Sequence, residues 1–256
     1  MDSSYWTNQE VIKASRDFVC IRLATYEDKK EVEFLKGIFR GRSGELENTT
    51  FVILDSDGKK RLSRSGRSPD FAFRGANAFV TGLNKIAKEK NSAEKRFSDA
   101  NLPLIKNVDL ALNVASCDQI QLVVVVGENE QKMNELAEKA APLAWNEKVG
   151  GQFLFAKTCD PKELLPINGK PPVNGLIVVE PGQFGMTGKI VESFGENIEF
   201  DRFVEKLAEH SATYEVLKDY RQHVQAGIQL GIKWESETPV TDQGSLRAVE
   251  RSRGGR

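Results

Sequence analysis

The chain has 256 residues, a formal net charge of −1 and a hydrophobic share of 39%. This near-neutral balance gives no overall field that would favour nucleic acid or a membrane surface. The length allows one or two domains of about 100–200 residues, and no run approaches the roughly 20 apolar residues of a membrane helix. Met1-Asp2-Ser3-Ser4 lacks the basic start of a signal peptide, although a trimmed leader would leave no trace. We therefore expect a soluble protein, with the cytoplasm as the default compartment.

Helical and extended patterns alternate in the first half of the chain. The run Phe18-Val19-Cys20-Ile21 is rich in β-formers, and Asp57-Gly58 is a strong tight-turn signal. The predicted elements are a short helix over 7–17, a strand over 18–23, a helix over 28–39, a hairpin over 50–65 and a long helix from Pro69.

The second half repeats the alternation. Four consecutive valines within 120–126 are too apolar for anything but a central strand. The predicted elements are helices over 108–115 and 128–148, strands over 120–126 and 153–156, a short helix or loop over 160–170, a hairpin over 176–194, and helices over 200–210 and 214–232.

Composition also suggests where the domains end. Residues 88–102 are polar and charged, which is typical of a connection between domains. The last stretch is polar with four arginines and is predicted to be disordered. The expected division is 1–90, 104–234 and a tail over 235–256.

Both halves follow the order strand, helix, strand-turn-strand, helix, and this order resembles the thioredoxin fold. The match is best over 151–211, where Pro171-Pro172 precede an apolar strand at the place where that family has a cis-proline. The resemblance implies that one of these two prolines is cis. In the first half Thr49 or Thr50 stands where the proline should be, and the family's first strand is missing. The predicted fold class is therefore α/β, with two thioredoxin-like units, each a mixed sheet flanked by helices, the first lacking its first strand.

The redox motif of that family is absent. The turn after the valine strand is Gly127-Glu128-Asn129-Glu130 and contains no cysteine. Dithiol exchange needs a thiolate at a helix N-terminus and a second thiol to resolve the mixed disulfide. Neither unit is therefore expected to perform it, and we expect no cofactor. No cysteine-histidine spacing resembles a zinc site, so no metal is expected either.

Three widely spaced cysteines do not make a disulfide framework. Cys20 is predicted to lie buried in a strand, where a thiol behaves as a small hydrophobe. Cys117 stands beside Asp118, whose carboxylate would raise the pKa of the thiol. Cys159 precedes Asp160-Pro161, a pattern typical of a capped helical turn, and is the best candidate for a reactive cysteine, although a weak one.

A basic cluster is the most distinctive local charge feature. On an edge strand such residues commonly protect against edge-to-edge pairing, and this is the favoured interpretation. Docking of an acidic partner is the next alternative, and nucleic acid is the least favoured. The cluster comprises Lys59, Lys60, Arg61, Arg64, Arg67 and Arg74.

The leading functional hypothesis is a redox-inactive thioredoxin-like protein that acts as a protein-binding or scaffold module. One alternative is a single-cysteine thiol oxidoreductase that uses Cys159 or Cys117. Another is a subunit of a larger assembly, in which a second chain completes the first unit's sheet by strand addition. The expected partner is another protein, with a homo-oligomer left open and neither nucleic acid nor a membrane expected.

Overall fold

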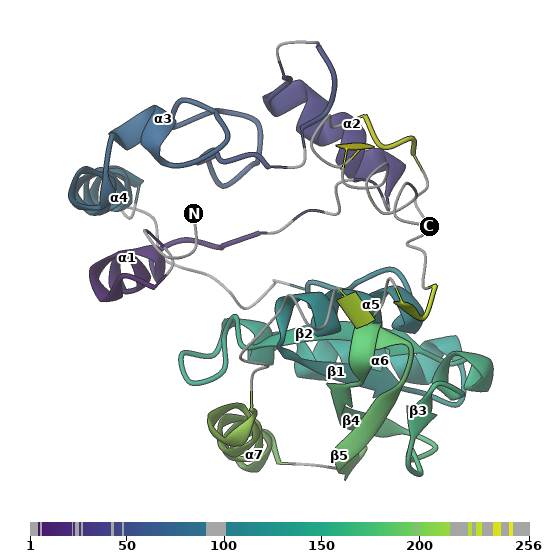
Figure 1. Cartoon of the computed structure of the whole chain (residues 1–256). Coiled ribbons are helices and arrows are strands. Elements are labelled where there is room, and N and C mark those ends of the chain that lie inside the picture. The colour runs from purple at the N-terminus through teal and green to yellow at the C-terminus, as the bar shows by residue number, and fades with distance from the viewer. Residues whose placement is uncertain are drawn as a thin grey trace. The chain divides into compact units, whose positions relative to one another are not determined.

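The computed structural model describes residues 5, 7–21, 23, 26, 28–41, 44–47, 49–90, 101–197, 199–215, 225–226, 229–231, 238–241 and 246–247. The chain divides into two compact units (Figure 1). Unit 1 comprises residues 1–95 and 233–256, and unit 2 comprises residues 96–232. Unit 1 is therefore built from both ends of the chain. Much of the predicted connection over 88–102 and of the predicted helix over 214–232 lies outside the described residues.

Unit 2 contains a five-stranded mixed sheet in the order β2-β1-β4-β5-β3. β1 runs parallel to β2 and antiparallel to β4, β4 and β5 form an antiparallel hairpin, and β3 lies parallel to β5. The strands are β1 (Gln121–Val126), β2 (Phe153–Thr158), β3 (Ile167–Asn168), β4 (Gly175–Pro181) and β5 (Gly188–Gly195).

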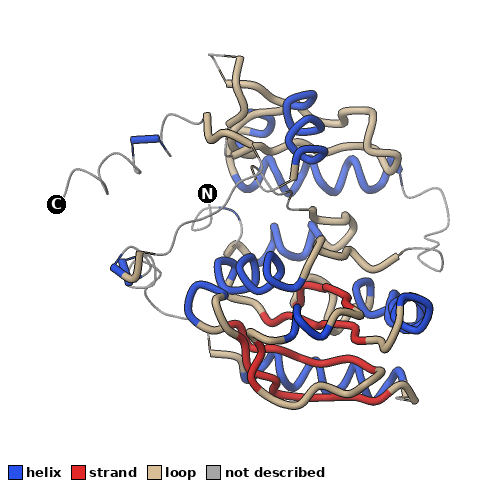
Figure 2. Tube along the Cα trace, turned by 90° about the vertical axis from the view of Figure 1, so that its right-hand side faces the viewer, coloured by secondary structure: helices blue, strands red, loops and turns tan. Residues whose placement is uncertain are grey.

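Helices cover both faces of this sheet (Figure 2). Leu122, Val124 and Val126 of β1 belong to the apolar cluster that includes α5 (Val108–Asp118). The alternate residues Val123 and Val125 belong to the cluster on the other face, with α6 (Glu130–Ala140) and α7 (Phe200–Thr213). Every residue of β1 is buried, so its continuous apolar sequence follows from its interior position between β2 and β4.

Two details of unit 2 differ from the sequence expectation. The helix predicted over 128–148 ends at Ala140 and continues as the 3-10 helix η2 (Ala141–Trp145). Pro142 explains the change, because proline has no amide hydrogen to donate to a carbonyl one turn earlier. The cis bond expected at Pro171 or Pro172 is also wrong, since both residues follow trans peptide bonds.

Unit 1 is mainly helical, with α1 (Gln9–Ser15), α2 (Lys29–Ile38), α3 (Asp70–Phe73) and α4 (Ala76–Lys90). Asp28, the first residue of the helix predicted over 28–39, caps α2, and Asn8 caps α1. The helix predicted from Pro69 is divided in two. Arg74 at φ 56° and Gly75 at φ 118° adopt left-handed backbone conformations, which interrupt the helical hydrogen bonds.

The extended segments of unit 1 do not assemble into a sheet among the described residues. The predicted hairpin is present only as two isolated antiparallel bridges, Phe51 with Gly66 and Leu54 with Arg61. Its turn does form where predicted, with the Gly58 amide donating to the Asp55 carbonyl at 2.8 Å. The run 18–21 is not a strand, and Cys20 is exposed rather than buried. The prediction of two thioredoxin-like units is therefore not confirmed, and the sheet that forms lies in unit 2.

The core of unit 1 is aromatic. Phe79 of α4 contacts Tyr5, Phe51 and Phe73 through ring-to-ring packing, with ring centroids 5.7, 5.4 and 5.2 Å apart. The buried Tyr5 hydroxyl donates to Asp70, and both burial and this carboxylate raise the pKa of the phenol. The segment before α1 is thereby joined to α3 and α4.

A second, smaller apolar cluster of unit 1, named here the Tyr26 cluster, consists of Tyr26, Val32, Leu35 and Leu46. Val240 packs against it, and the Thr238 amide donates to the Tyr26 carbonyl at 3.2 Å. Residues 238–241 therefore contact the N-terminal part of unit 1, while the disorder expected for the tail over 235–256 stays a prediction. The remaining tail residues, apart from 246–247, lie outside the described part of the chain.

Candidate functional site

The end of β1 places the turn before α6 next to two other strands. Val126 pairs with Thr158 at the end of β2 and with Gly175 at the start of β4. The Gly127 amide then donates to the Thr158 carbonyl at 3.1 Å. Three segments that are distant in sequence thus meet at one end of the sheet, where the thioredoxin resemblance would place a redox motif.

An asparagine holds this turn from the segment before β4. The Asn174 side-chain oxygen accepts from the Glu128 amide at 2.9 Å, and its nitrogen donates to the Glu128 carboxylate at 3.4 Å. Asn129 then caps α6, because its side chain accepts from the Lys132 amide at 2.9 Å. The exposed side chains of the turn are therefore carboxylates and amides. Such groups can form hydrogen bonds, and carboxylates can transfer protons, but neither can perform thiol–disulfide exchange.

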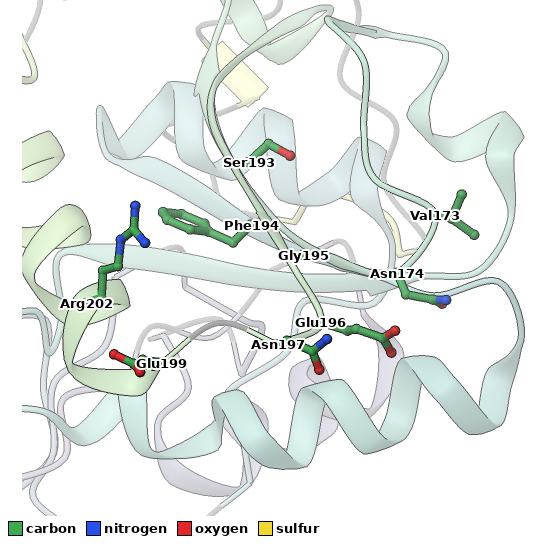
Figure 3. A pocket seen from close by; sticks show the side chains of 9 residues that line it. All are labelled: Val173, Asn174, Ser193, Phe194, Gly195, Glu196, Asn197, Glu199 and Arg202. Carbon is green, nitrogen blue, oxygen red and sulfur yellow. The ribbon is translucent and has the colours of Figure 1, made fainter.

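A cavity of about 810 Å³ opens at the same end of the sheet (Figure 3). It lies between the segment before β4, the end of β5 and the first turn of α7. Its walls carry one aromatic ring, both signs of charge, two amides and a hydroxyl. The lining residues are Val173, Asn174, Ser193, Phe194, Gly195, Glu196, Asn197, Glu199 and Arg202.

The charged side chains around the cavity form two groups. Lys132 and Glu196 form an ion pair at 2.6 Å, which lowers the pKa of Glu196 and raises that of Lys132. Glu199 and Arg202 line the cavity from α7, on the other side of Phe194 in the view of Figure 3. Phe194 itself is held by edge-to-face packing on Phe203, with ring centroids 4.5 Å apart. The Phe194 ring is thus held in place, and charged groups of both signs lie around it.

The three cysteines are far from a dithiol arrangement. None is joined in a disulfide; Cys20 is exposed, and Cys117 and Cys159 are half-buried. Desolvation by the surrounding protein raises the pKa of the Cys20 thiol although the residue as a whole is exposed. Cys117 lies near the end of α5 and therefore belongs to a different element from the β1–α6 turn.

Cys159 lies at the sheet end that carries the cavity, because it directly follows Thr158. The predicted cap after it is confirmed: the Asp160 side chain accepts from the Lys162 amide at 2.9 Å, and Pro161 begins the 3-10 helix η3 (Pro161–Leu164). This turn is too short to act as a helix dipole on the thiol, and Cys159 is not among the residues that line the cavity.

The six residues of the predicted basic cluster are all exposed, but they do not act alike. The Arg61 guanidinium donates to the Gly37 carbonyl at 2.6 Å, at the end of α2. Arg67 pairs with Glu47 at 3.5 Å. These two arginines therefore stabilise unit 1 itself. The structure shows no partner for the cluster as a whole.

Phe71 was missed in this region by the sequence reasoning. It stands between Arg67 and Arg74 and is 51% exposed, so an aromatic ring does accompany the basic residues. Ring exposure is not readable from sequence: in one unbroken helix from Pro69, Phe71 would share a face with Phe79. The break at Arg74 and Gly75 removes it from that face.

No family model, curated protein or solved structure matches this chain. Within the described residues, no three His, Cys, Asp or Glu side chains gather closely enough to hold a metal ion. No helix among them is long and apolar enough to span a bilayer. The functional argument therefore rests on the geometry of this chain.

The sequence also did not indicate four side chains of the candidate site, those of Asn174, Lys132, Glu196 and Arg202. Asn174 lies between the double proline and β4, and the sequence pattern there signals proline geometry but not the role of the amide. The other three come from α6, the end of β5 and α7, and only the tertiary structure brings Lys132 to Glu196 and places Glu196 and Arg202 at one cavity.

Proposed function

We propose that this chain is a redox-inactive thioredoxin-like protein that acts as a protein-binding or scaffold module. Unit 2 supports the proposal through its topology. A central strand parallel to β2 and antiparallel to β4, followed by the β4–β5 hairpin and a helix, is the order on which the resemblance rests. Fold alone does not give function, so the argument turns to the site.

The contact between Asn174 and Glu128 carries the proposal. In the thioredoxin family the turn after this strand presents cysteines, whereas here its backbone and carboxylate are occupied by an amide from the segment before β4. A turn held in this way is prearranged for recognition. Rigid polar groups favour binding because less conformational entropy is lost when a partner docks.

The chemistry of the adjoining cavity favours a polypeptide partner. Its ring, amides and opposite charges match the mixed side chains and main-chain groups of a protein segment. Interfaces commonly combine an anchored aromatic with arginine and a polar rim, which Phe194, Arg202 and the two asparagines supply. The partner is therefore expected to dock across the end of the sheet.

Site-specific photo-crosslinking tests this location. A photoreactive residue replaces exposed Ser193 at the cavity, and in a matched control it replaces exposed Gln152, at the opposite end of the sheet. The proposal expects one discrete crosslinked protein from position 193, suppressed by excess unlabelled wild-type chain, and none from position 152. Identical crosslinking from both positions, or none from either, would contradict it.

The position of Cys159 favours one second candidate, a single-cysteine thiol oxidoreductase. The carbonyl of its neighbour Thr158 accepts a hydrogen bond from the Gly127 amide, so Cys159 lies next to the candidate site. Alkylation rates of all three cysteines against pH, with Cys→Ser variants at 20, 117 and 159, test this candidate. One thiol that reacts fast at a pH well below about 8.5 supports an enzyme, and three slow thiols leave the binding module.

A further inference from the structure

The segment 238–241 contacts unit 1 through both polar and apolar groups. The Thr238 amide donates a hydrogen bond to the Tyr26 carbonyl, and the Thr238 hydroxyl donates to the same carbonyl at 3.3 Å. The Thr241 hydroxyl donates to the Leu46 carbonyl at 3.4 Å. Between them, Val240 packs on the Tyr26 cluster. Three hydrogen bonds and one side chain therefore fix four consecutive residues.

The groups of unit 1 that accept these bonds are main-chain carbonyls, those of Tyr26 and Leu46. Such acceptors recognise amides and hydroxyls in an incoming chain whatever the rest of its sequence, and the apolar cluster adds a preference for an aliphatic side chain. Main-chain hydrogen bonds with a pocket for alternate side chains are a recurring mode of peptide recognition. The arrangement around 238–241 shares two of these features, one main-chain hydrogen bond from Thr238 to Tyr26 and an apolar contact for the Val240 side chain.

We propose that the Tyr26 cluster and its two carbonyls form a peptide-binding site of unit 1, and that residues 238–241 are its displaceable occupant. The ligand in trans is an extended segment with the same chemistry, an aliphatic residue flanked by hydroxyl side chains. This site lies in unit 1 and does not depend on the function proposed for the cavity of unit 2.

The contacts explain why the occupant is displaceable. All three hydrogen bonds are longer than the commonest donor–acceptor separations. Thr238, Val240 and Thr241 are only half-buried, and Pro239 is exposed. The segment is held because it belongs to the same chain, which gives it a high effective concentration. A competing segment binds weakly as long as the site is filled from within.

Fluorescence polarisation with the full-length chain tests the proposal. The probe is a labelled peptide with the sequence of residues 235–244, added to the wild type and to Val240→Asp. A carboxylate placed against the apolar Tyr26 cluster disfavours docking of the chain's own segment, so the variant is expected to bind the probe at least about tenfold more tightly. Val19→Asp adds the same charge at an exposed position of unit 1 outside the Tyr26 cluster; it is the matched control and should bind as the wild type does. Equal affinity for wild type and Val240→Asp would overturn the proposal.

A second probe checks that recognition is specific. The same peptide with Asp in place of its valine should lose at least about tenfold in affinity for the Val240→Asp chain. Equal binding of both peptides would show non-specific adhesion and would overturn the site.

Hydrogen exchange measures the occupant directly in the wild type. The Thr238 amide should exchange slowly, and in Val240→Asp it should exchange freely while the amides of α4 stay protected. An unprotected Thr238 amide in the wild type overturns the proposal. If Val240→Asp unfolds unit 1, the double variant Thr238→Val/Thr241→Val decides, because it keeps the apolar contact and removes two donors. It should still bind the probe more tightly than the wild type, and unchanged affinity would contradict the site.

Discussion

The two units begin from the same local pattern and end as different structures. In unit 2 the predicted strands form a sheet whose central strand is buried along its whole length between two helical layers. In unit 1 the corresponding segments form a helical body around an aromatic cluster, with a hairpin reduced to two bridges. The comparison separates what a β-rich segment prefers from what its surroundings permit.

The difference lies in the partners that each segment finds. β1 has hydrogen-bonded neighbours on both sides and an apolar cluster on each face. The run 18–21 has comparable β-propensity, yet Val19 and Ile21 are 51% and 74% exposed. Strand preference largely reflects packing against neighbours rather than an intrinsic property of the backbone. A good strand sequence that finds no paired strand among the described residues of unit 1 remains irregular.

The largest expected effects come from the two cores. Phe79→Ala in unit 1 and Phe203→Ala in unit 2 each remove a ring that is 2% exposed, which should cost about 3–5 kcal/mol of unfolding free energy. Hydrogen exchange should show the loss confined to the unit that carries the substitution. Loss of protection in both units from either variant would show that they unfold as one body.

Gly175→Ala should break the β4–β5 pairing that distinguishes unit 2. Gly175 has φ 155°, and a Cβ there would overlap the carbonyl oxygen of Phe194. The expected cost is more than about 2 kcal/mol, from backbone strain and the displaced strand. Gly151→Ala is the control, because its φ is also positive, 74°, but its Cβ would meet nothing within 4 Å. Chemical denaturation compares the two, and equal losses near 1 kcal/mol would mean that strain alone acts.

Gln121→Leu should sharpen the comparison by making unit 2 more stable. Gln121 is 2% exposed at the start of β1, and neither polar atom of its amide has a hydrogen-bond partner within the described structure. Replacing a buried, unsatisfied amide by an apolar group should add about 1–3 kcal/mol in thermal or denaturant unfolding. Gln131→Leu, on an exposed face of α6, should stay within about 0.5 kcal/mol of the wild type. A loss of stability in Gln121→Leu would show that this amide is hydrogen-bonded in solution.

Asn174→Ala tests the contact on which the candidate site depends. Loss of the bond to the Glu128 amide should lower stability by about 0.5–1.5 kcal/mol and accelerate exchange of that amide. Asn197→Ala changes another amide of the same cavity and should leave the Glu128 amide protected. Equal protection of that amide in all three chains would mean that the turn is held by other contacts.

The smallest expected effect concerns the exposed pair of Lys132 and Glu196. The folded-state pKa of Glu196 lies below its ordinary value, because Lys132 hydrogen-bonds to the carboxylate. The pair therefore contributes stability at neutral pH that is lost as pH falls through this lowered pKa, and again as pH rises through the raised pKa of Lys132. In Lys132→Met, an NMR titration should show the pKa of Glu196 moving upward, with little change in unfolding free energy. An unmoved pKa would exclude the pair as its cause.

Short-range signals in the sequence located several features correctly. Asp160 caps the turn that it was expected to cap, Asp57-Gly58 marks a real turn, and the valine run is a buried interior strand. Each of these signals acts within a few residues, because a cap or a turn satisfies backbone groups of its immediate neighbours. The absence of cysteines from the β1–α6 turn can likewise be read directly from the sequence.

Only the tertiary structure decided the rest. Asn174 meets Glu128 across 46 residues, and Thr238 meets Tyr26 across 212. Whether the runs at 18–21 and 50–65 became a sheet also depended on neighbours that no local pattern specifies. Such contacts form because burial of apolar surface brings distant segments together. Sequence thus determined which residues cap, turn and fill the cores, whereas packing determined which strands pair and which polar groups meet at the sheet end.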